Sequence, residues 1–293
     1  MMKKRAMAAM VLLCGFLIAA GAVAGGRGSK AVREQAESSL QLSGTITIGK
    51  DGSVLAHTLD PKAPLGQPLT EFVNKAVAGW RFTPIRVDGE LVNAKVPMHL
   101  RLVAKYSEDD KVSVTIASSY FGGGDGVPES DNPTRIKLAP PNYPKAALYV
   151  GGKGTVYLVV QIDRTGKVAN VEAEQVNLRV VGTTNEMARM RDQFSAAAVR
   201  AARGWTFAIP TTGDAADDDS WLVRVPVEFA LRGPGEKSPT KEGAWDTYIP
   251  GPRNMGMPWA QEKLKTAGSP DALPEAAGVY PLRQGATLLT PLG

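Results

Sequence analysis

Two separate stretches of the chain show the same order of hydrophobic and polar periods. Each begins with a Gly-Thr segment in which apolar and polar residues alternate, the two-residue period of a half-buried strand. A Gly-containing turn and a second strand follow, as in a β-hairpin. The first stretch reads "SGTITIGKDGSVLAHTLD" and the second "KGTVYLVVQIDRTGKVANVEA". The period then changes to that of an amphipathic helix, whose apolar stripe is Leu69, Phe72, Val73, Ala76, Val77 and Trp80 in the first stretch and Phe194, Ala197, Ala198, Ala201 and Trp205 in the second.

Both helices are predicted to end in the same short motif, "GWRFTP" at residues 79–84 and "GWTFAIP" at residues 204–210. The glycine suits the exit of a helix, because it tolerates backbone angles that other residues avoid. An aromatic pair at this spacing is typical of core packing. We therefore expect Trp80 and Phe82, and likewise Trp205 and Phe207, to anchor the core of their own unit.

The predicted fold class is α+β, with two small units that each pack one helix on a three- or four-stranded sheet. A last strand containing Val-Pro follows each aromatic motif. A right-handed crossover then gives the strand order 2-1-3 and places the third strand at an edge. Pro97 and Pro226 favour this edge position for the third strands, because proline has no N–H to donate to a neighbouring strand. An alternating segment at residues 111–119 could pair with residues 96–103 and cover the edge of the first unit.

These patterns divide the chain into six parts. We predict a signal peptide at residues 1–24, an N-terminal segment at 25–42, a first unit at 43–119, a Gly/Pro linker at 120–133, a second unit at 134–232 and a Pro/Gly-rich tail at 233–293. The tail is expected to be largely disordered, or to pack its aromatic residues on the second unit or on a partner. Its segment "PWAQEKLKTAG" predicts one short helix.

The first residues combine three basic side chains, an apolar stretch to about residue 23 and the small-x-small pattern "AVA". This is the form of a secretory signal peptide cleaved before Gly25, and an uncleaved membrane anchor is the alternative. The single cysteine, Cys14, lies in this segment, so the mature chain would have no disulfide. The segment also holds three of the 34 basic residues and none of the 29 acidic ones, so the basic excess of the whole chain is no argument for nucleic-acid binding.

No motif in the sequence predicts catalysis, a metal site or a cofactor. Outside the N-terminal segment the histidines are His57 and His99, and the strand period places His99 on the solvated face opposite the core. The acidic segment "GDAADDDS" lacks the ligand spacing of a calcium loop and is interpreted as a solvated loop. We expect a protein that is not an enzyme and that binds no cofactor.

Residues 134–232 resemble the C-terminal domain of the TonB energy transducers. The resemblance rests on "PPNYPKAA", "GTVYLVVQIDRTGKV", "AARGWTFAIP" and "VRVPVEFAL". Residues 43–103 share the strand, helix, Trp-x-Phe-x-Pro and Val-Pro parts but lack the Tyr-Pro segment, so the second copy is the closer match. The resemblance implies two tandem domains of this family, located in the periplasm of a Gram-negative bacterium.

The resemblance also implies a binding function. Domains of this family capture the TonB box, a short extended segment of outer-membrane transporters, by adding it to an edge strand. Carried over, that edge is residues 222–231, with Tyr143 and Pro144 as a second contact. The implied partner-binding residues are Tyr143, Pro144, Leu222, Arg224, Pro226, Glu228 and Ala230.

Three functions remain open from the sequence. The first is a periplasmic adaptor that binds extended segments of envelope proteins. The second is a transducer anchored in the inner membrane that contacts the ExbB–ExbD motor, although residues 6–24 lack the Ser and His that the family uses there and no long Pro-rich spacer follows. The third is a structural envelope protein that self-associates, for example as a homodimer, by edge pairing.

Overall fold

The computed structural model describes residues 27–60, 65–87, 89–106, 112–122, 129–231, 243–273, 278–283 and 285–292. The predicted signal peptide therefore lies outside the described residues. Among those that are described, no helix combines the length and apolar character needed to cross a membrane. The structure is mixed α+β with mainly antiparallel sheets and few helices, so the predicted class is confirmed.

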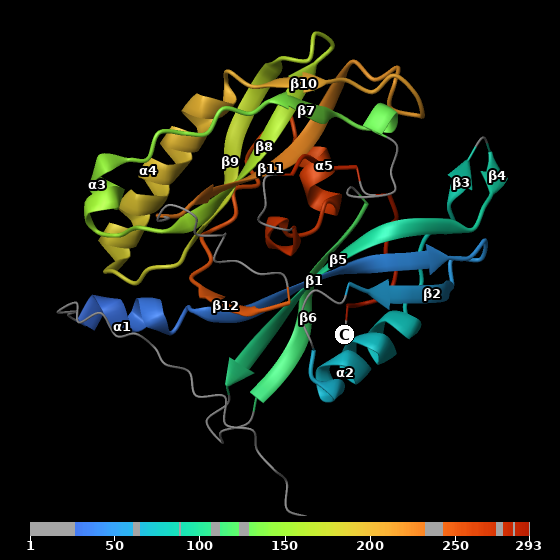
Figure 1. The fold of residues 1–293 in the computed structure, drawn as a ribbon, viewed down its shortest axis with the longest axis horizontal. Helices are drawn as coiled ribbons and strands as arrows, with labels where there is room; N and C mark the ends of the chain where they lie inside the picture. The colour runs from blue at the N-terminus through green and yellow to red at the C-terminus, as the bar shows by residue number, and fades with distance from the viewer. Residues whose placement is uncertain are drawn as a thin grey trace, which may run out of the picture.

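The first sheet has five strands (Figure 1). A short helix, α1 (Arg27–Arg33), precedes β1 (Glu37–Ile48), which therefore starts before the expected boundary at residue 43. The strand order is β12-β1-β5-β6, with β2 also paired to β1. The remaining elements of this part are β2 (Val54–Leu59), α2 (Gln67–Ala78), the small hairpin β3 (Arg86–Val87) and β4 (Glu90–Leu91), β5 (Ala94–Tyr106) and β6 (Val112–Phe121).

The second sheet has the order β13-β11-β8-β9. It is built from β8 (Gly154–Asp163), β9 (Val168–Leu178), β11 (Ser220–Phe229) and β13 (Tyr280–Pro281), and α4 (Thr184–Ala202) covers one of its faces. A 3₁₀ turn η1 (Glu129–Asp131), a short helix α3 (Lys145–Tyr149) and a separate pair of strands, β7 (Thr134–Lys137) with β10 (Thr206–Ala208), complete this part.

The predicted order 2-1-3 is observed in both sheets, as β2-β1-β5 and as β9-β8-β11. In the first sheet the expected covering of residues 96–103 by the strand that follows them is confirmed, because β6 pairs with β5. In the second sheet the prediction that the third strand is an edge is wrong, because β13 pairs with β11. Pro97 fits within β5 because its carbonyl accepts a hydrogen bond from the Gly122 N–H at 2.9 Å. In an antiparallel ladder the N–H and C=O of a residue face the same neighbour, so the donor that Pro97 lacks would face Gly122, just past the end of β6.

Besides the strand order, the same backbone hydrogen bond recurs within each half. In the first, the Phe82 N–H donates to the carbonyl of the turn residue Gly52 at 2.9 Å, and in the second the Phe207 N–H donates to that of Gly166 at 2.8 Å. Both glycines have positive φ, 80° and 76°, and in both a Cβ would collide with the carbonyl oxygen of the phenylalanine. Each Trp-x-Phe motif therefore ties the end of a helix to the hairpin turn of its own sheet.

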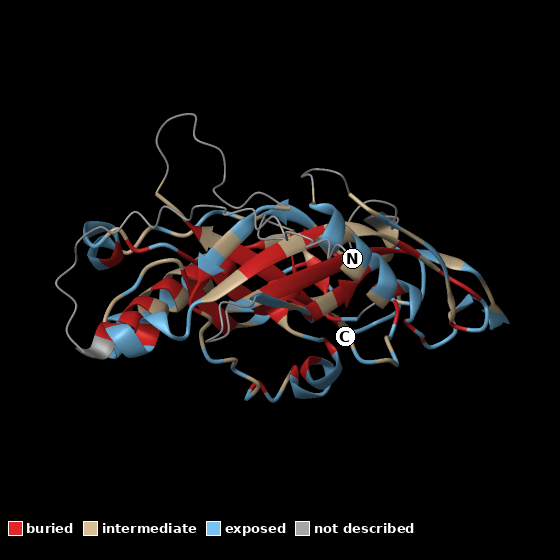
Figure 2. Ribbon diagram, turned by 90° about the horizontal axis from the view of Figure 1, so that it is seen from below, coloured by how far each residue is buried: buried red, intermediate tan, exposed pale blue. Residues whose placement is uncertain are grey.

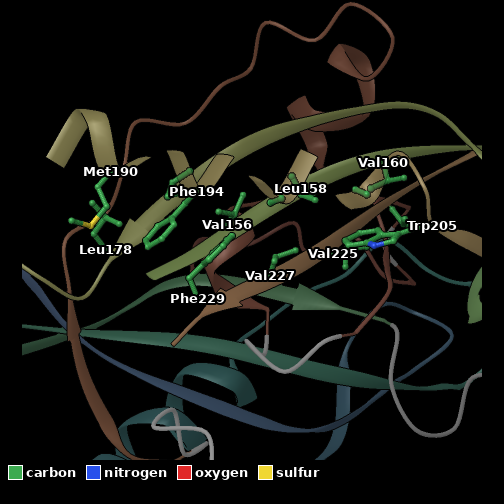
Figure 3. Close-up of a cluster of buried hydrophobic side chains, with 14 of the residues drawn as sticks. Val156, Leu158, Val160, Leu178, Met190, Phe194, Trp205, Val225, Val227 and Phe229 are labelled. Atoms are coloured by element: carbon green, nitrogen blue, oxygen red, sulfur yellow. The ribbon is translucent and has the colours of Figure 1, made fainter. Parts of the chain in front are cut away.

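Two cores lie on the helix-covered faces of the sheets. Figure 2 shows the buried residues in red, and Figure 3 shows side chains of the second core. Trp80 and Phe82 are buried in the first core, and Trp205 and Phe207 in the second. Figure 3 shows Phe194 of α4 beside Phe229 of β11, and their rings stack with centroids 4.3 Å apart.

The C-terminal tail joins both sheets, so it is not simply an appendage of the second one. Strand β12 (Trp245–Tyr248) pairs with β1, and β13 pairs with β11. Between them lie α5 (Gln261–Thr266), which the sequence predicted as a short helix, and the 3₁₀ turn η2 (Pro270–Ala272).

The linker predicted at residues 120–133 starts later in the structure, because Tyr120 and Phe121 are buried residues of β6.

Tail residues cover the helix-free face of each sheet. Val159 of β8 packs against Met257, Leu264 and Leu282 of the tail, so β8 is buried on both faces rather than half-buried. On the first sheet Tyr120 packs against Leu273 and Tyr280. The prediction of a solvated His99 is wrong for the same reason: its Nδ1 lies 2.8 Å from the Ser43 hydroxyl and its ring stacks on Tyr120.

Candidate functional site

The candidate site is the outer edge of β11, where the sequence placed the partner-binding residues. Within this strand Leu222 and Glu228 are half-buried, whereas Arg224 and Pro226 are buried, and Ala230, just after the strand, is half-buried. Strand β13 pairs with this edge in antiparallel register, with Val223 opposite Pro281 and Arg224 opposite Tyr280. The Leu282 N–H extends this pairing by donating to the Leu222 carbonyl at 2.8 Å.

Arg224 lies in a buried ion network and does not project from the edge into solvent. Its Nε and Nη2 donate to the two carboxylate oxygens of Glu174 on β9, at 2.7 and 2.8 Å. Its Nη1 and Nη2 also donate to the carbonyls of Ala267 and Gly268 in the tail, at 2.6 and 3.0 Å. Arg253, another tail residue, donates to Glu174 at 2.6 Å. Bidentate pairing satisfies both buried charges and holds the tail against the sheet.

A second polar network holds the tail on the first sheet. Arg101 of β5 forms ion pairs with Glu37 at 2.8 Å and with Asp271 of η2 at 3.2 Å. The Tyr248 hydroxyl accepts a hydrogen bond from Arg101 at 2.7 Å and lies 3.2 Å from Asp271 Oδ2. Burial raises the pKa of Tyr248, and the nearby Asp271 carboxylate raises it further.

The first sheet contributes directly to the surroundings of β13. The Tyr120 hydroxyl of β6 donates to the Pro281 carbonyl at 2.9 Å. The Tyr280 ring makes edge-on contacts with Tyr120 and with His99, at centroid distances of 5.9 and 6.3 Å. Burial raises the pKa of Tyr120, which stays a neutral donor at physiological pH. The site around β13 is therefore made by both sheets.

Tyr143 and Pro144 lie near the opposite end of β11. Pro144 occupies the N-cap position of α3, and the Tyr143 hydroxyl donates to the Gly152 carbonyl. The Tyr143 ring packs edge-on against Phe194 and against Phe229, the last residue of β11. The structure thus brings Tyr143 to the end of the strand by core packing, and burial raises its pKa.

The sequence analysis did not identify Glu174 or the tail residues Tyr280, Pro281 and Leu282 as parts of this site. The signal for the tail was the short apolar run Val-Tyr-Pro-Leu within a Pro/Gly-rich segment, which is the form of a short buried strand. The signal for Glu174 was a carboxylate within the alternating part of β9. Neither signal indicates which partner the residue meets.

Comparison with known proteins finds similarity over part of the chain. No protein-family model matches it, and no solved structure matches it. Protein TonB from Xanthomonas campestris pv. campestris, in strain B100 and in strain ATCC 33913, is 39% identical to it over 94 residues. That third of the chain is similar to TonB. The match covers 32% of this chain and 36% of each relative, so the chain spans about a third of the length of the curated relatives it matches. This similarity supports a TonB-like domain within the chain.

Proposed function

We propose that this chain is a periplasmic TonB-like protein with a role in envelope transport. It binds extended segments of envelope or outer-membrane transport proteins by adding them as a strand to the edge of β11. The similarity to TonB supports the class of function, and the arrangement of β11 supports the mode of binding.

The observation that carries the proposal is the pairing of β13 with β11. A two-residue extended segment of the chain itself occupies this edge in antiparallel register. In strand addition the backbone groups of an edge provide affinity and the neighbouring side chains provide selection. The β11 edge therefore has the form that accepts an added strand, and a partner has to take the place of β13 in order to use it.

The two halves of the chain are proposed as tandem TonB-like domains, with the second as the closer match. The shared strand order and the paired Phe82–Gly52 and Phe207–Gly166 hydrogen bonds support a common ancestry. The first half differs because β6, a ten-residue strand, covers β5 along most of its length. We assign partner binding to β11 for this reason.

The proposed protein is not an enzyme, and its partners are proteins. Cleavage of residues 1–24 would release it into the periplasm, whereas retention would make it an inner-membrane transducer able to contact an ExbB–ExbD motor. Self-association by edge pairing is the third possibility, and concentration-dependent dimers would support it.

Photo-crosslinking in living cells tests the proposal. A photoreactive residue at Leu222, on the β11 edge, is expected to capture an outer-membrane transporter. Val87, which is exposed in the β3–β4 hairpin, serves as the matched control. A variant at Val225 would not test edge binding cleanly, because Val225 is buried in the second core. Capture of the same proteins from Val87 as from Leu222, or of none from Leu222, would contradict strand addition at this edge.

A further inference from the structure

The segment at residues 278–283 is bound to the rest of the chain as a peptide ligand would be. Its backbone pairs with Leu222–Arg224 of β11. Tyr280 and Leu282 are both buried, in two different pockets. The backbone contacts are few, since the ladder with β11 covers only two residue pairs. Side-chain contacts therefore provide much of the binding, and they define which sequence fits.

The pocket for Tyr280 belongs to the first sheet. Tyr120 and His99 contact its ring edge-on, and the Tyr120 hydroxyl holds the next carbonyl, that of Pro281. Edge-on aromatic pairs add to the energy of burial, so an aromatic side chain is preferred at this position. A proline is accepted at the next position because the Pro281 carbonyl, rather than an N–H, makes the contact.

The pocket for Leu282 belongs to the second sheet and the tail. Leu282 packs among Val159, Met257 and Leu264, an apolar cluster that favours an aliphatic side chain. A cleft of about 340 Å³ continues beyond it, lined by residues that include Trp221, Trp259 and Arg283. A longer segment can extend from the Leu282 position into this cleft.

We propose that the segment recognised at the β11 edge has the sequence aromatic-Pro-aliphatic, the same kind as Tyr280-Pro281-Leu282, and that it binds by displacing this internal copy. The inference rests on the proposed function, strand addition at β11, and specifies the partner's sequence. It also gives the first half a role, because its Tyr120 and His99 supply the pocket for the aromatic residue, while β11 of the second half supplies the backbone edge. The chain's own segment competes with the partner and limits its apparent affinity.

The test uses a labelled peptide with the sequence GVYPLR, that of residues 278–283, and the full chain. A chain with Tyr280→Ala and Leu282→Ser is expected to bind the peptide about tenfold more tightly than the parent, because the internal competitor is weakened. Fluorescence polarisation measures both affinities. A peptide with serine in place of its tyrosine is expected to lose binding. Tyr120→Phe is added to the Tyr280→Ala, Leu282→Ser chain, in which the internal copy is weakened, and is expected there to weaken peptide binding about fivefold, the value of one hydrogen bond.

Gly278→Ala is the second variant, in case the double variant does not fold. A Cβ at Gly278 would run into the Tyr280 ring, so this change disturbs the internal segment without altering the pockets. It is also expected to raise peptide affinity over that of the parent. Equal binding of the tyrosine and serine peptides, or no peptide binding by a variant that unfolds cooperatively, would overturn the inference. Dimers of the Gly278→Ala chain in which residues 278–283 of one copy bind the β11 edge of the other would also overturn the inference, because the segment bound at the edge would then come from a second copy of this chain.

The outcome can be separated from that of the proposed function. If transporter segments lacking an aromatic-Pro-aliphatic sequence bind at β11 while GVYPLR does not, the inference fails and strand addition stands. If Leu222 captures no transporter and neither kind of segment binds, the proposed function fails as well.

Discussion

The buried Arg224–Glu174 pair provides the most quantitative prediction. Glu174 is fully buried and Arg224 is 1% exposed, and the same carboxylate also pairs with the partly exposed Arg253. Glu174→Gln keeps the size of the side chain but removes its charge, which leaves Arg224 buried without an anionic partner. Breaking a buried pair in this way costs about 3–5 kcal/mol of unfolding free energy. Urea denaturation of the parent and the variant measures the difference.

The matched control is the exposed pair between Arg283 and Asp214, whose side chains are 57% and 82% exposed. Arg283→Ala is expected to change stability by less than about 1 kcal/mol, because water screens such a pair. Combining Glu174→Gln with Arg224→Met is expected to cost about 1–3 kcal/mol less than the sum of the two single changes, since the two residues share one interaction.

The same substitution is expected to loosen the tail. Arg224 donates to the Ala267 and Gly268 carbonyls, and Arg253 reaches Glu174 from the tail, so an altered network holds these segments less firmly. Limited proteolysis in the tail should then be faster in Glu174→Gln than in Arg283→Ala. The reasoning is refuted if Glu174→Gln costs no more than Arg283→Ala, or if the paired changes are additive.

Three further outcomes are expected. Gly166→Ala should lower the unfolding free energy by about 1–3 kcal/mol, because the new methyl group would strike the Phe207 carbonyl. Gly151→Ala, also at positive φ but with open space around it, should lower it less. Thermal unfolding that ranks the two variants the other way would contradict this. Burial raises the pKa of Tyr120, so above about pH 10 the folded state keeps a proton that the unfolded state loses. The unfolding free energy should therefore fall as the pH rises further, and it should fall less steeply in Tyr120→Phe. An equal slope in the parent and the variant would contradict the assignment. The intact mass of periplasmic protein should correspond to a chain that starts at Gly25, and a full-length species in the inner membrane would favour the anchored transducer instead.

Local patterns were enough to predict the main strands and helices of both halves, but not the short elements α1, β3, β4, β7, α3 and β10. The alternating strands, the helical stripes and the Gly-Trp-x-Phe motifs depend on neighbours along the chain, and right-handed crossovers then determine the order β2-β1-β5 and β9-β8-β11. The hydrogen bond from the Phe207 N–H to the Gly166 carbonyl joins residues far apart in sequence and was not predicted.

The site was harder to predict because its contacts join residues far apart in sequence. Arg224 looked like an outward-facing edge residue, yet it pairs with Glu174 and with tail carbonyls. The face of His99 looked solvated because nothing in the local period reveals that the tail residue Tyr280 covers it. A strand as short as β13 carries too few residues to display a period, so its pairing could be found only in the folded chain.

A reversible disulfide lock tests most directly whether partners bind at the β11 edge. Val223 and Pro281 are opposite each other in the β11–β13 register, a separation suited to a disulfide. In a chain with Val223→Cys, Pro281→Cys and Cys14→Ser, oxidation fixes β13 in place. We expect the oxidised protein to lose binding of an outer-membrane transporter segment and the reduced protein to regain it. Equal binding by the oxidised and reduced forms would contradict strand addition at β11.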